Sequence, residues 1–105
     1  MNEARRDRLA AAGWRSGEAA DFLELTEEEA AFVELKLALA DYLRELRTQN
    51  SWTQSQVARR LGSSQSRVAK MEAADASVSL DLLVKSLLAL GVSRSEVGRV
   101  ISKAA

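Results

Sequence analysis

The fold of this chain is decided by residues 53–72, which read TQSQVARRLGSSQSRVAKME. Thr53 and Gln56 have the spacing of a capping box, in which each side chain bonds a free backbone N–H of the first helical turn. Gly62 can take the left-handed conformation that ends a helix. Ser64 is a favourable N-cap for the helix that follows. The stretch therefore predicts two short helices joined by a tight turn.

The apolar residues of this stretch lie on one side of each predicted helix. Val57 and Leu61 are one turn apart in the first helix, and Val68 and Met71 have the spacing of inward-packing residues in the second. The outer side of the second helix then carries polar and cationic side chains, namely Gln65, Ser66, Arg67 and Lys70. A helix with such a face fits the DNA major groove.

This motif resembles the helix-turn-helix of the Cro/CI family, also called XRE-type, found in phage repressors and bacterial regulators. The resemblance covers residues 37–92 and rests on Trp52-Thr53-Gln54, Ala58-Arg59-Arg60-Leu61-Gly62, Ser64-Gln65, Val68 and Met71-Glu72. It implies an all-α, five-helix, lambda-repressor-like domain over residues 26–105. Residues 1–25 would form an N-terminal extension that is helical or partly disordered.

The resemblance also implies roles for particular residues. Those expected to face base edges are Gln65, Ser66 and Lys70, and Arg67 can contact either a base or a phosphate. Those expected at the DNA backbone are Gln54, Arg59, Arg60 and Ser64. Arg47 and Glu72 stand at positions that often form a structural ion pair in such domains. The chain departs from the pattern at Ala74, where a glycine commonly ends the recognition helix, so the conformation of residues 73–77 is left open.

Composition agrees with a helical binding protein. The 105 residues include no proline, cysteine or histidine. The absence of proline permits long helices, and the absence of cysteine and histidine removes thiolate nucleophiles, imidazole bases and the usual zinc ligands. We therefore expect no enzyme activity, no cofactor and no metal site. The sequence shows no apolar stretch of signal-peptide or membrane-spanning type, so a cytoplasmic protein without a membrane partner is expected.

The charges are unevenly distributed although the formal net charge is zero. Residues 1–40 carry five basic and nine acidic side chains, whereas residues 44–70 carry six basic and one acidic. The attraction for DNA phosphates is therefore local to the motif. The plainer alternative is that Arg59 and Arg60 only solvate a helix face.

Three more helices are expected around the motif. The first begins at Thr26, in a capping box with Glu29, and runs to about Gln49. Its inner face would consist of Phe32, Leu35, Leu39, Tyr42, Leu43 and Leu46, with Val33 and Leu37 on the flank. The second follows Ser79 and ends at Gly91. The third begins with a capping box of Ser93 and Glu96 and ends near Lys103.

The sequence permits two roles for several side chains. Trp52 is expected to shield the junction between helices rather than to stack on a base. Trp14 is either an interface anchor or a plug against the long helix, and Phe32 is a further candidate for a partner surface. Val97, Val100 and Ile101 either complete the core or form a two-fold contact.

These observations predict a sequence-specific transcriptional regulator that binds a double-stranded DNA operator as a homodimer and represses by occupying it. The short length and the acidic extension resemble HigA-like antitoxins, which neutralise a cognate toxin protein and repress their own operon. The alternative from another class is a protein-interaction module that keeps the helix-turn-helix scaffold without binding DNA.

Overall fold

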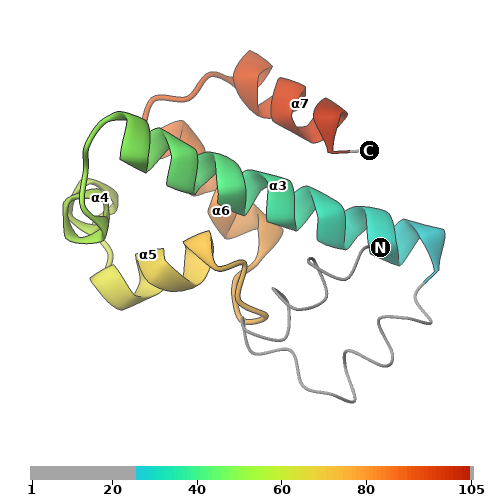
Figure 1. Ribbon diagram of the computed structural model, residues 1–105, viewed down its shortest axis with the longest axis horizontal. Helices are drawn as coiled ribbons and strands as arrows, with labels where there is room; N and C mark the ends of the chain where they lie inside the picture. The colour runs from blue at the N-terminus through green and yellow to red at the C-terminus, as the bar shows by residue number, and fades with distance from the viewer. Residues whose placement is uncertain (1–25, 105) are drawn as a thin grey trace.

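The computed structural model describes residues 26–104, which form five helices and no strand. The helices are α3 (Glu27–Gln49), α4 (Gln54–Leu61), α5 (Gln65–Glu72), α6 (Leu80–Ala89) and α7 (Arg94–Lys103). The long α3 crosses the molecule, with α7 on one side and α5 on the other (Figure 1). The all-α class is confirmed. The predicted extension over residues 1–25, including Trp14, lies outside the described residues.

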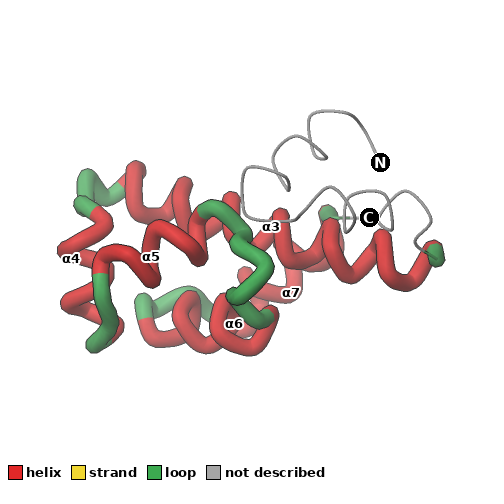
Figure 2. Tube along the Cα trace, turned by 90° about the horizontal axis from the view of Figure 1, so that it is seen from below, coloured by secondary structure: helices red, strands yellow, loops and turns green. Residues whose placement is uncertain are grey.

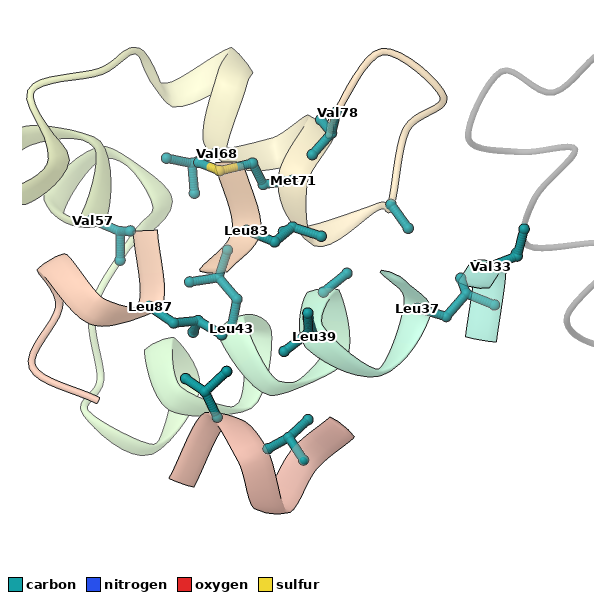
Figure 3. Packing of buried hydrophobic residues seen from close by; sticks show 14 of the residues in the cluster. Val33, Leu37, Leu39, Leu43, Val57, Val68, Met71, Val78, Leu83 and Leu87 are labelled. Carbon is teal, nitrogen blue, oxygen red and sulfur yellow. The ribbon is translucent and has the colours of Figure 1, made fainter. Parts of the chain in front are cut away.

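A single hydrophobic core joins the helices, because each contributes inward side chains (Figure 3). The largest fully buried side chains are Leu39, Leu43, Val57, Val68, Met71, Leu83 and Leu87. Val97 and Val100 are buried in the same core, so they contribute to the packing of the monomer. Ile101 is half-buried at the edge. Burial of Val57, Val68 and Met71 attaches α4 and α5 firmly to the rest of the domain.

The buried face of α3 differs from the prediction in its first half. Val33 and Leu37, expected on the flank, are buried, whereas Phe32, expected inside, is 51% exposed. On the buried side of α3, Lys36 Nζ donates a hydrogen bond to the Asp75 carbonyl in the loop after α5, 2.8 Å away. A contact with a segment distant in sequence, which helical spacing does not reveal, therefore lies on the buried stripe of α3.

Four successive helices end in the same backbone arrangement. Ser51, Gly62, Ala74 and Gly91 have positive φ, and the N–H of the residue after each bonds the carbonyl five residues earlier, as in a Schellman motif. Gly62 takes the predicted left-handed conformation at φ 64°. Ala74 takes it at φ 53° although it is not glycine, so the departure from the family pattern leaves the helix end intact. Ser51 does the same at φ 57°.

The first and last predicted capping boxes form only in part. The hydroxyls of Thr26 and Ser93 accept the N–H groups of Glu29 and Glu96, as expected. Glu96, however, turns its carboxylate to the Arg99 guanidinium and accepts a hydrogen bond from the Tyr42 hydroxyl at 3.2 Å. This carboxylate therefore ties α7 to α3 instead of closing a capping box. Within residues 26–104, no helix is long and apolar enough to cross a membrane.

Candidate nucleic-acid interface

The helix pair α4–α5 is built by local capping. The Thr53 hydroxyl accepts the Gln56 N–H at 3.0 Å, and the Gln56 side-chain oxygen accepts the Thr53 N–H at 2.7 Å, so this capping box is complete. Gly62 ends α4, and the Ser64 hydroxyl caps α5 by accepting the Arg67 N–H at 3.2 Å. The two helices and the tight turn are therefore those expected from residues 53–72.

One side of α5 is inside the protein and the other faces solvent. Val68, Met71 and Glu72 are buried. The exposed side carries the residues expected to meet DNA, which are Ser64, Gln65, Ser66, Arg67 and Lys70. In Figure 2, which views the molecule from below, α5 lies on the near face. This surface is therefore accessible to a partner without rearrangement of the domain.

A chain of polar contacts connects this face to α3. The Arg47 guanidinium donates to both carboxylate oxygens of Glu72, at 2.5 and 2.9 Å, and also to the Trp52 carbonyl at 3.1 Å. Glu72 in turn accepts from the Gln54 amide at 3.3 Å. Gln54 then accepts from the Gln65 amide at 2.6 Å. The side chains at the starts of α4 and α5 are thus held in one network that ends on the exposed face.

The Arg47–Glu72 ion pair is largely buried. The side chain of Arg47 is 17% exposed and that of Glu72 is 5% exposed. The hydrogen bonds to Glu72 raise the pKa of Arg47 above its ordinary value, although burial opposes this. A bidentate pair of this kind has fixed geometry, so it orients the two helices that it joins.

The cations of α4 lie beside an aromatic ring. The Arg60 guanidinium carbon is 4.2 Å from the centre of the Trp52 ring, a cation–π distance. Trp52 is half-buried and packs against the core, in keeping with its expected place at the helix junction. Arg59 and Arg60 are both exposed. Stacking uses the face of the Arg60 guanidinium and leaves its in-plane N–H groups available to an acceptor.

All the solvent-exposed charged side chains of α4 and α5 are basic. They are Arg59, Arg60, Arg67 and Lys70, and the one carboxylate of the two helices, Glu72, is buried against Arg47. The surface is therefore cationic although the whole chain has no net charge. Such a local field attracts polyanions.

Comparison with known proteins agrees with this geometry. A family model described as helix-turn-helix matches residues 43–101, from within α3 to within α7. The chain belongs to this helix-turn-helix family. The helix-turn-helix domain is of the XRE type that the sequence motif predicted, and membership indicates a DNA-binding transcription regulator. No curated protein and no solved structure matches the chain significantly.

The helix-turn-helix domain also contains contacts that the sequence motif did not indicate. Gln54 and Gln65 were assigned to DNA separately, yet the structure bonds them to each other. Lys36 is 5% exposed and bonds the Asp75 carbonyl beyond the end of α5, and burial lowers its pKa below the ordinary value. The only available signal for the first contact was that both glutamines open a helix. For Lys36 no local pattern marks a buried cation.

Proposed function

We propose that this helix-turn-helix protein is a sequence-specific repressor that binds an operator as a homodimer and acts by occupying it. The observation that carries the proposal is the exposed face of α5, on which Gln65 is held by Gln54 beside exposed cationic side chains. A preorganised side chain loses less conformational entropy when it meets a base edge.

The hydrogen-bonding capacity of Gln65 suits adenine. A glutamine amide has two N–H donors and one oxygen that accepts. One donor of Gln65 is used by Gln54, which leaves the second N–H and the oxygen on the same terminal group. These can bond N7 and the N6 amino group of adenine, the pairing that distinguishes adenine in the major groove. We assign Ser66 and Lys70 to neighbouring base contacts, and Arg67 to a base or a phosphate.

Counting hydrogen-bond donors and acceptors in the same way assigns Gln54 to the DNA backbone. Its oxygen accepts from Gln65 and one of its N–H groups bonds Glu72. The remaining N–H is free to donate to a phosphate oxygen at the start of α4, where backbone N–H groups also favour an anion. We assign Arg59, Arg60 and the N-cap Ser64 to the remaining backbone contacts.

Two-fold binding is supported by the small size of the recognition surface. One α5 can read only a few base pairs, and two of them about 34 Å apart would read two half-sites and gain specificity. Of the residues expected at a partner surface, Phe32 is exposed and Ile101 is half-buried at the rim of the core. These two remain candidates for the contact between subunits.

The test is selection of bound sequences from random DNA, followed by titration of wild type and Gln65→Ala on the selected site and on a scrambled site. Gln65→Ala should lose about 1–3 kcal/mol on the selected site and relax preference at one base position. Equal losses on both duplexes would refute base reading by Gln65. A selected site without dyad symmetry would refute the homodimer.

An antitoxin role is the sub-type that we favour. It is supported by the acidic start of α3, where Glu27, Glu28 and Glu29 precede the exposed Phe32 at the end of α3 remote from α4 (Figure 1). A basic toxin is the partner that this surface would suit. The test is co-expression with the product of the neighbouring gene. A stable complex that Phe32→Ala weakens supports the role, and full operator affinity with no such neighbour contradicts it.

A further inference from the structure

A second cationic site lies beside the recognition helix, on the edge that does not carry Gln65. A pocket of about 340 Å³ opens between the α4–α5 turn, α5 and α6, and Figure 2 shows α6 running beside α5. Ser63, Arg67 and Lys85 line the pocket, with Met71 and Ser86 among its other lining residues. Among residues 26–104, no acidic side chain lines it.

The two cations of this pocket are available for an anion. Arg67 comes from the third position of α5 and Lys85 from the middle of α6, and both are exposed. Their side chains have no hydrogen-bond or ion-pair partner among the described residues. Asp81, one turn before Lys85, forms no ion pair with it in this part of the chain. Two unpaired cations that share a pocket repel each other, and an anion placed between them removes that repulsion.

The floor of the pocket is formed by buried side chains of α5 and α6. Met71 is 1% exposed and Ser86 is 5% exposed, and the Ser86 hydroxyl donates to the Met71 sulfur at 3.4 Å. The floor therefore belongs to the core that fixes α5 against α6. Arg67 and Lys85 project from fixed helices around it, so the separation of their backbones does not depend on a flexible loop.

We propose that this pocket seats a DNA backbone phosphate between Arg67 and Lys85, which adds α6 to the nucleic-acid interface. The inference rests on the proposed DNA binding and deepens it. Gln54 would hold the backbone at one edge of α5, and the Arg67–Lys85 pair would hold it at the other. Backbone contacts on both flanks of a recognition helix fix how it is oriented in the groove.

The experiment measures DNA binding by the full chain and by Lys85→Ala over a range of salt concentrations. Lys85→Ala should bind all sequences about three- to tenfold more weakly, and its plot of log affinity against log salt should be less steep by about 0.9. Lys85→Arg should restore most of the affinity. Lys103→Ala is the matched control, because Lys103 is an exposed lysine on α7, on the far side of α3 from α5 (Figure 1).

A duplex series with single neutral methylphosphonates locates the contact. One substitution should weaken wild type strongly and Lys85→Ala less, because only Arg67 still contacts that phosphate in the variant, while Lys85→Ala still discriminates between selected and scrambled sites. The inference is wrong if Lys85→Ala binds DNA with the same affinity and the same salt slope as the wild-type chain. The inference is also wrong if the pocket binds inorganic phosphate saturably while Lys85→Ala binds DNA as the wild-type chain does. Failure of the wild-type chain to bind any DNA would instead refute the proposed function.

Discussion

Replacing Arg47 with methionine should destabilise the domain more than any exposed substitution of similar size. The change removes two charge-assisted hydrogen bonds, of 2.5 and 2.9 Å, from a carboxylate that is only 5% exposed. Breaking a buried ion pair from one side costs about 3–5 kcal/mol, because the charge that stays behind is poorly solvated. That is a large part of the roughly 5–15 kcal/mol by which a domain of this kind is stable.

The reverse substitution, Glu72→Met, should cost less, about 2 kcal/mol. Arg47 is 17% exposed and keeps its hydrogen bond to the Trp52 carbonyl, and its long side chain can carry the charge toward water. The double variant Arg47→Met with Glu72→Met contains no buried charge at this place. It should be within about 1 kcal/mol of wild type, since apolar replacements of buried pairs are often neutral.

Urea unfolding followed by far-ultraviolet circular dichroism at neutral pH measures these differences. Arg44→Met is the control, because Arg44 is an exposed arginine of the same helix and should change the free energy of unfolding by less than about 0.5 kcal/mol. The reasoning is refuted if the two single losses add in the double variant, because additivity means that the pair is not energetically coupled.

Three further predictions test other parts of the structure. Ser51→Gly should stabilise the domain by about 1 kcal/mol, because Ser51 is exposed with φ 57° and glycine carries no steric cost there; thermal unfolding measures it, and an equal gain from Ser55→Gly, inside α4, would contradict it. Arg59→Ala should weaken binding to selected and scrambled DNA alike and make the salt slope shallower by about 0.9, as measured by fluorescence anisotropy; a loss confined to the selected site would disprove a backbone contact. Glu96→Gln should make stability less sensitive to acid: hydrogen bonds from Arg99 lower the pKa of Glu96 below its ordinary 4.5, so its contribution is complete above that pH and is lost as the pH falls through the lowered value. Melting temperatures at neutral and acid pH measure this, and an equal acid-induced decrease in wild type and variant would show that Glu96 has no such role.

The prediction of the helix-turn-helix from sequence succeeded where the determining interactions are local. The Thr53–Gln56 capping box, the left-handed Gly62 and the Ser64 N-cap each act within a few residues, so short spacings reveal them. The inward direction of Val68 and Met71 follows from helical periodicity in the same way. The DNA contacts assigned to individual side chains remain predictions until they are measured.

The tertiary structure decided everything that depends on how one helix lies against another. The Gln54–Gln65 hydrogen bond spans 11 residues, Lys36 reaches Asp75 across 39, and Tyr42 reaches Glu96 across 54. The exposure of Phe32 and the pocket that unites Arg67 with Lys85 likewise arise from packing. The amino-acid sequence by itself determined where helices begin and end, because backbone hydrogen bonds are satisfied within a turn. Which distant side chains meet was determined only when the shared core fixed the helices in place.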